Sequence, residues 1–146
     1  MSKVIVVPVD GSEHSGKALQ TACEMVAGMR ARLHVVHVPQ ATHEDRALML
    51  GGAAILAHAS DEELEQAGRE VLAAARAVAV ENGCDEIQTE LLSGDPAKAI
   101  VEEAERVRAD MIVMGSRGLS DLAGLVFGSV SHKVMHMAPC TCMAVR

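Results

Sequence analysis

The stretch KVIVVPVDGSEHSGKAL, residues 3–19, decides the fold class. Its first part is a strand-length run dominated by Val and Ile, which is typical of a strand covered on both faces. The residues after Asp10 have the pattern of a turn followed by a helix with Ala18 and Ala22 on one side. A buried strand that leads directly into a helix is the repeating unit of an open parallel α/β sheet.

The same unit recurs along the chain. Further apolar runs of strand length lie at 33–38, 87–92, 111–114 and 140–145. Apolar residues at helical spacing predict four helices, with stripes at Ala18, Ala22, Met25 and Met29, at Leu64, Ala67, Val71, Ala74 and Val78, at Ala97, Ile100, Ala104 and Val107, and at Val130, Val134 and Met137. Ser60 with Glu63 forms a capping box, and Asp95 followed by Pro96 marks another helix start. This alternation predicts an α/β fold with a single open five-stranded parallel sheet and right-handed crossovers, which puts helices on both faces.

Length and composition limit the function classes. With 146 residues, 49% of them hydrophobic, the chain fits a single domain over residues 1–146. It has no Trp or Tyr and one Phe, so it lacks stacking platforms for single-stranded nucleic acid. A formal charge of -7 disfavours attraction to nucleic acid or anionic lipid. The apolar runs are shorter than a membrane span, so we expect a cytoplasmic protein with reduced cysteines, no membrane insertion and no nucleic-acid partner.

Residues 11–17 spell G-x-x-x-x-G-K, the start of a P-loop. A P-loop next requires a Ser or Thr hydroxyl for Mg²⁺, and this chain has Ala18 there. The match therefore fails at its metal ligand, and we expect Lys17 to be a helix-surface residue. The N–H groups of a helix start still attract an anion, so the question is which loop would hold a nucleotide.

A second glycine-rich segment follows the fourth predicted strand. Gly115, Gly118 and Gly128 are spaced G-x-x-G, nine residues, G-S. The first two let the backbone approach a ligand without a Cβ, and Gly128 opens the fourth helix, where N–H groups and the helix dipole favour an anion. Hydroxyl groups and cations that could join them are on Ser129, Ser131, Arg117 and Lys133. The alternative is a glycine-rich surface loop that ends in a helix cap.

Three segments in this order resemble the universal stress protein family. They are VPVDGSEHS after the first strand, LHVVHV as the second strand, and GSRGLSDLAGLVFGSVSHKVMHMAPC near the C-terminus. The resemblance spans nearly the whole chain. It implies a Rossmann-like sheet of the adenine nucleotide alpha hydrolase type with strand order 3-2-1-4-5. In that family the glycine spacing marks the ATP-binding branch, and Gly115, Gly118, Gly128 and Ser129 match every position of it.

The resemblance also implies a ligand site where strands one and four lie side by side, the reversal point at which open α/β sheets bind ligands. Asp10 then lies beside the nucleotide, through a ribose hydroxyl or Mg²⁺, the Val38 backbone contacts adenine, and residues 115–131 surround ribose and phosphates. The implied binding residues for ATP or AMP are Pro8, Val9, Asp10, Val38, Met114, Gly115, Arg117, Gly118, Gly128, Ser129, Val130 and Ser131. No catalytic residue is expected.

The leading function is a nucleotide-binding stress-response or signalling module that an unidentified partner recognises, without enzymatic activity beyond weak ATP hydrolysis. The alternative is an adenine-nucleotide-dependent enzyme with slow ATP hydrolysis or phosphoryl transfer, although the chain lacks the H-x-G-H and S-G-G-x-D-S motifs. A third class, a chaperone-like oligomer with an empty pocket, would use the apolar region 47–57. The family resemblance implies a homodimer joined through strand 141–145, where less branched residues replace the usual valines.

Several smaller features of the sequence have two alternative interpretations. Segment 39–60 is either a lid or oligomer contact, or a loosely ordered helix broken at Gly51 and Gly52. His132 and His136 lie four apart, and Cys140 and Cys142 form C-x-C. Each pair could bind a metal ion, but a solvated helix face and small buried thiols are the alternatives, and we expect no metal site. His34 and His37 are three apart in a strand and therefore point to opposite faces.

Overall fold

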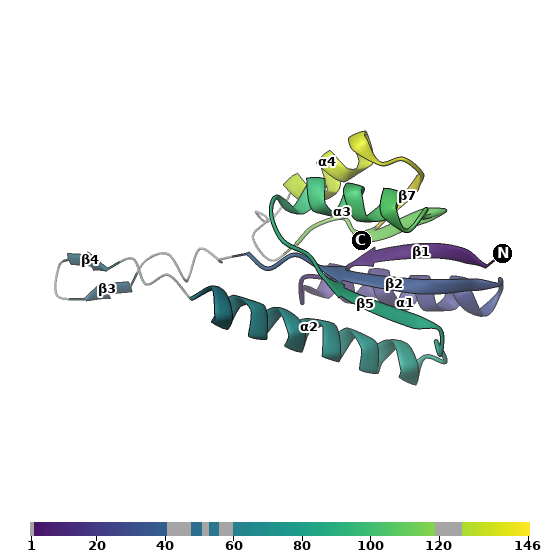
Figure 1. The fold of residues 1–146 in the computed structure, drawn as a ribbon, viewed down its shortest axis with the longest axis horizontal. Coiled ribbons are helices and arrows are strands. Elements are labelled where there is room, and N and C mark those ends of the chain that lie inside the picture. Colours follow the sequence, from purple (N-terminus) through teal and green to yellow (C-terminus); the bar gives the residue numbers. More distant parts are fainter. Residues whose placement is uncertain (1, 41–47, 51–52, 56–59, 119–126) are drawn as a thin grey trace.

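A five-stranded sheet forms the centre of the structure, which is a computed structural model (Figure 1). It describes residues 2–40, 48–50, 53–55, 60–118 and 127–146. The strands of this sheet are β1 (Lys3–Pro8), β2 (Ala31–His37), β5 (Ile87–Leu91), β6 (Met111–Gly115) and β7 (Thr141–Val145). All pairings are parallel and the order is β5-β2-β1-β6-β7. Counted along this sheet the order is 3-2-1-4-5, which confirms the prediction.

Four helices cover the two faces of the sheet. They are α1 (Glu13–Ala27), α2 (Asp61–Glu81), α3 (Pro96–Arg106) and α4 (Ser129–Met137). One buried cluster joins α1 and α2 to the sheet, and a second joins α3 and α4 to the opposite face. Among the described helices, none is both long enough and apolar enough to cross a membrane.

The two histidines of β2 show how its side chains divide between these clusters. His34 bonds Glu103 of α3, with 2.6 Å between Nε2 and Oε1. The His37 ring lies on the α2 side, where its Cδ2 atom is 3.1 Å from the position that a Cβ on Gly68 would take. The prediction that these rings point to opposite faces is confirmed.

Short polar residues fix where three of the helices begin. The Ser12 hydroxyl accepts from Ser15 N in α1, and Asp95 accepts from Lys98 N in α3, where Pro96 takes the first position. Ser60 and Glu63 form the predicted capping box of α2. Each cap satisfies N–H groups that a helix start leaves without an intrahelical acceptor.

The buried face of α2 differs from the predicted stripe. The buried residues of this helix are Gly68, Leu72, Ala75 and Ala79. Ala67 and Ala74 of the predicted stripe are exposed, while Leu64, Val71 and Val78 are half-buried. A glycine was not counted as a core position, yet Gly68 lies against β5, where an added Cβ would come within 2.7 Å of Leu91 Cδ1. The contact line of α2 is therefore shifted by one residue.

Two short strands lie in segment 39–60. β3 (Leu48–Leu50) and β4 (Ala53–Ile55) pair antiparallel with Leu50 opposite Ala53. They extend away from the central sheet (Figure 1). The alternative of a broken helix is therefore wrong for these residues. Residues 41–47, 51–52 and 56–59 lie outside the described residues. The lid or oligomer contact proposed for this segment therefore stays a prediction.

Candidate functional site

The candidate site lies where the carboxyl ends of parallel strands meet, next to the reversal of strand order between β1 and β6. After β1 the chain turns at Gly11, whose φ of +82° is a conformation that favours glycine. The Asp10 carboxylate accepts a bond from Ser12 N at 2.9 Å. This Asx turn fixes the half-buried Asp10 directly before α1.

The first turn of α1 lies against the end of β6. A Cβ on Gly115 would be 2.7 Å from the carbonyl carbon of His14 and 2.9 Å from Ser15 N. Because these are backbone atoms, they can move only if the helix moves. The glycine spacing predicts that Gly115 allows close approach to a ligand, and the structure adds a different reason for glycine, the packing of α1 on β6.

Ser116 connects three elements at this edge. Its carbonyl oxygen accepts bonds from Gly128 N at 2.6 Å and from the Ser131 hydroxyl at 2.8 Å. Its N–H donates to Val145 O of β7 at 2.7 Å. The single Ser131 hydroxyl proton is thus directed to a backbone carbonyl, Ser116 O or Gly128 O. The Ser131 hydroxyl is bonded to backbone in this structure, and its role toward an anion stays a prediction.

The start of α4 is unlike the starts of the other described helices, because no side chain caps it. Its N-cap residue is Gly128, which is buried, and it is followed by the exposed Ser129. The N–H groups of a first helical turn depend on partners outside the helix, and they carry the positive end of its dipole. This end of α4 has the features of an anion-binding site.

A cation lies beside the first turn of α1. Arg117 Nη2 is 3.0 Å from His14 Nε2. Because a guanidinium only donates, His14 Nε2 accepts and the ring carries its proton on Nδ1. At this edge of the sheet, the buried His14 Nδ1 and the buried Ser116 hydroxyl have no hydrogen-bond partner among the described residues, and the same is true of His34 Nδ1 on the α3 side. Sequence reasoning missed both residues, since it weighed only the glycine and lysine positions around His14.

The structure brings the predicted nucleotide residues to the ends of β1, β2 and β6 and the start of α4. Val9, Val38, Met114, Gly128 and Ser131 are buried, Pro8, Asp10, Gly115, Arg117, Gly118 and Val130 are half-buried, and Ser129 is exposed. Val38, Met114 and Val130 belong to the cluster on the α3–α4 face. The Val9 side chain lies in the opposite cluster, so only its backbone could contact a ligand on that face. Residues 119–126 of the glycine-rich segment lie outside the described residues.

Comparison with known proteins decides the family. The model of the universal stress protein family matches residues 1–146. The chain belongs to this family. Universal stress protein YxiE of Bacillus subtilis is 33% identical to it over 100% of both chains.

Solved universal stress proteins share the fold. One, in complex with cAMP, has a TM-score of 0.72 and 29% identity, and the match covers 99% of this chain and 97% of that one. Another, from Archaeoglobus fulgidus in complex with dAMP, has a TM-score of 0.71 and 26% identity, with 100% and 98% covered. Both of these solved universal stress proteins are therefore complexes with an adenine nucleotide.

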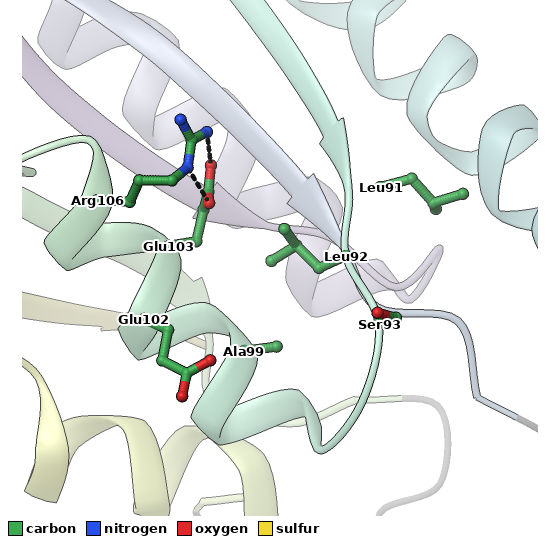
Figure 2. A pocket seen from close by; sticks show the side chains of 7 residues that line it. All are labelled: Leu91, Leu92, Ser93, Ala99, Glu102, Glu103 and Arg106. Atoms are coloured by element: carbon green, nitrogen blue, oxygen red, sulfur yellow. Dashed lines mark hydrogen bonds and ion pairs between the residues drawn. The ribbon is translucent and has the colours of Figure 1, made fainter.

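A cavity of about 340 Å³ lies between β5 and α3, apart from the predicted nucleotide-binding residues (Figure 2). Its lining residues are Leu91, Leu92, Ser93, Ala99, Glu102, Glu103 and Arg106, none of which is in the predicted nucleotide set. Glu103 is buried, and it accepts two bonds from Arg106 as well as contacting His34. The Arg106 guanidinium holds the pKa of the Glu103 carboxyl below its usual value, with burial opposing it and His34 supporting it.

The C-x-C pair lies at the start of β7. Burial raises the pKa of the Cys140 thiol and of the Cys142 thiol. Since the thiolate is the form that binds metal ions, both shifts disfavour a metal site on this pair. Among the described residues, no group of three or more His, Cys, Asp or Glu side chains could hold a metal ion.

Proposed function

We propose that this universal stress protein binds an adenine nucleotide, ATP or AMP, in the crevice between the ends of β1 and β6. The observation that carries the proposal is the uncapped start of α4, which Ser116 holds at the end of β6. Arg117, which follows Ser116 and bonds His14, adds a cation at this edge of the sheet. Backbone N–H groups, a helix dipole and a fixed cation are the features that bind phosphate. The cAMP and dAMP complexes of related proteins support adenine as the base.

Each part of the crevice has an assigned role in this proposal. The phosphates bind at Gly118, Gly128 and Ser129, the Val38 backbone contacts adenine, and Asp10 binds a ribose hydroxyl or a Mg²⁺ ion. Carboxylate oxygens suit Mg²⁺, which keeps several waters and contacts substrate phosphates. Metal and ribose remain alternatives at Asp10 that a titration with and without Mg²⁺ separates.

We propose binding rather than turnover as the function, because no side chain assigned to the phosphates is a general base that could activate a water molecule. Nucleotide occupancy would then shift the population of a conformation that a stress-response or signalling partner recognises. An enzyme with slow ATP hydrolysis remains the competing function.

Isothermal titration calorimetry with ATP, AMP, cyclic AMP and GTP tests the proposal. We expect saturable 1:1 binding of at least one adenine nucleotide and weaker binding of GTP. A phosphate-release assay on the same samples measures turnover. Absence of adenine-nucleotide binding at millimolar concentration would exclude the proposed function, and rapid phosphate release would favour the enzyme.

Lys17 provides a test of the P-loop alternative. Its ammonium group lies on the α1 surface, 3.3 Å from Glu13, and the side chain is half-exposed. Lys17→Ala is expected to change the affinity for ATP by well under the ~1.5–3 kcal/mol typical of a hydrogen bond to a charged group. Calorimetry measures the difference, and a hundredfold loss of affinity would restore the P-loop interpretation.

His14 should act by positioning Arg117. His14→Leu removes the acceptor and is expected to lower affinity for ATP by about tenfold, or about 1.4 kcal/mol, while affinity for adenosine stays unchanged. His14→Gln restores an acceptor and should recover most of the loss. Equal ATP affinity in the wild type and the leucine variant would show that Arg117 needs no such support.

We further propose a homodimer through the open edge of β7. The Val145 carbonyl accepts from Ser116 N, so residue 145 is directed toward β6. By alternation along the strand, the N–H of Ala144 points to the open edge, where it is available to a second subunit. An unpaired strand edge is a liability that proteins normally cover.

Ala144→Pro is expected to shift the protein toward monomer, because it removes a donor from the open edge and leaves the bonds to β6 in place. Ala144→Val keeps the N–H group and is the matched control. Light scattering across a dilution series measures the oligomeric state. A proline variant that stays dimeric would show that the subunits meet elsewhere.

A further inference from the structure

His132 and His136 are adjacent on the outer side of α4. Their spacing of four places them on one helix face, and both side chains are exposed. Their ring centroids are 4.6 Å apart with an angle of 68° between the planes. The sequence showed only the spacing, whereas the structure brings the two rings into contact.

The separation of the two rings suits a shared metal ion. A ring nitrogen binds Zn²⁺ or a similar ion at about 2.0–2.1 Å, which places the ring centre roughly 3.2 Å from the ion. At an N–metal–N angle of about 90–110°, two such centres lie roughly 4.5–5.2 Å apart. The observed 4.6 Å falls within this range, so two rings at this separation can share one ion.

Each of the other histidines with described side chains has one ring nitrogen in a hydrogen bond, and the second nitrogen of His14 and of His34 is buried away from solvent. His34 bonds Glu103, His37 bonds the Val9 carbonyl, and His14 bonds Arg117. For the rings of His132 and His136, the described part of the chain shows their mutual contact and no side-chain hydrogen bond or ion pair. Their nitrogens are therefore open to a ligand from solvent.

We propose that His132 and His136 form a two-histidine site on α4 for an exchangeable divalent transition-metal ion. Imidazole suits Ni²⁺, Cu²⁺ and Zn²⁺, whereas Mg²⁺ and Ca²⁺ take oxygen ligands. No larger group of metal-binding side chains lies within the described residues, so water completes the coordination shell. The formal charge of -7 favours the approach of a cation.

Metal binding at this site should stabilise the fold. The two rings are neighbours only while α4 is helical, so the ion binds the folded chain more tightly than the unfolded one. The proposal does not depend on nucleotide binding, because the probe is the metal alone.

Calorimetric titration with Ni²⁺ tests the site, with Mg²⁺ as the comparison ion. We expect 1:1 binding of Ni²⁺, no binding of Mg²⁺ at the same concentration, and a rise in the melting temperature with Ni²⁺. His132→Ala and His136→Ala should each weaken Ni²⁺ binding at least about tenfold, since each removes one of two ligands.

The matched control keeps the number of histidines. His136→Ala combined with Met137→His moves the second ring about 100° around the helix, to about 140° from His132, at a position where the native side chain is already exposed. This variant should bind Ni²⁺ as weakly as His136→Ala alone. The proposal would be overturned if the wild-type protein bound no Ni²⁺. It would also be overturned if the variants bound Ni²⁺ as tightly as the wild type, because the ion would then bind elsewhere.

Discussion

Replacing Glu103 by alanine is expected to lower the free energy of unfolding by about 2–4 kcal/mol. Glu103 is 6% exposed, and it joins the buried His34 of β2 to Arg106 of α3. Truncation leaves a cavity and removes the acceptor of a buried imidazole. Arg106 contributes little to the cost, because its side chain is largely exposed and water can take the place of the carboxylate. Urea denaturation of the variant and the wild type measures the difference.

The neighbouring carboxylate provides a matched control. Glu102 forms an exposed ion pair with Lys98 at 3.7 Å, a kind of contact worth ~0–1 kcal/mol. Glu102→Ala should therefore change stability little. An equal loss of stability in both variants would mean that truncating a glutamate anywhere on α3 is destabilising, and that the buried bond between Glu103 and His34 is not the cause.

The contribution of Glu103 should depend on pH in a defined direction. Its pKa is lowered in the folded state, chiefly by Arg106. The contribution is therefore fully present above the unfolded-state pKa of about 4.3, and it is lost as pH falls through the lower folded-state pKa. The stability difference between wild type and Glu103→Ala should shrink in acid. A difference that stays constant would assign the whole effect to the cavity.

Gly118→Val should reduce the affinity for adenine nucleotide by at least about a hundredfold, which corresponds to about 2.7 kcal/mol. In the proposed site, phosphate approaches the backbone at Gly118, and a branched side chain would occupy that space. Gly118 is only half-buried, so we expect the fold to survive. Calorimetry gives the affinity, and thermal unfolding checks the fold.

Gly16 is the control for this substitution. It lies on α1, and an added Cβ there would have no heavy atom within 4 Å. Gly16→Val inserts the same side chain at a glycine of the P-loop look-alike and should leave nucleotide affinity unchanged. If Gly16→Val abolishes binding and Gly118→Val does not, the phosphates bind at the start of α1 instead.

Much of the fold follows from local patterns in the sequence. The apolar run at 3–9 and the four later runs became the strands of the sheet, and the capping residues Ser60 and Asp95 start helices as predicted. These features depend on residues that are close together in the chain, so the spacing of apolar residues and the helix-capping residues can be recognised in the sequence. Strand order came from the resemblance to a family and not from periodicity.

The contacts that sequence reasoning missed join distant residues. Glu103 looks like one of several surface acids on α3, and its partner His34 is 69 positions away. The residues that crowd Gly115 lie at the start of α1, about a hundred positions earlier. Neither contact produces a recognisable pattern in the nearby sequence, because both depend on how the helices pack against the sheet. The same reason explains the shifted face of α2.

The close contact between Gly68 and Leu91 restricts how the chain can vary in evolution or design. Alanine at position 68 would favour the helical state of α2 by roughly 0.8–1 kcal/mol, but its Cβ would come within 2.7 Å of Leu91 Cδ1. Leu91 would have to rotate or become smaller. The two positions should therefore change together, as a compensating pair in which a larger residue on the helix accompanies a smaller one on the strand.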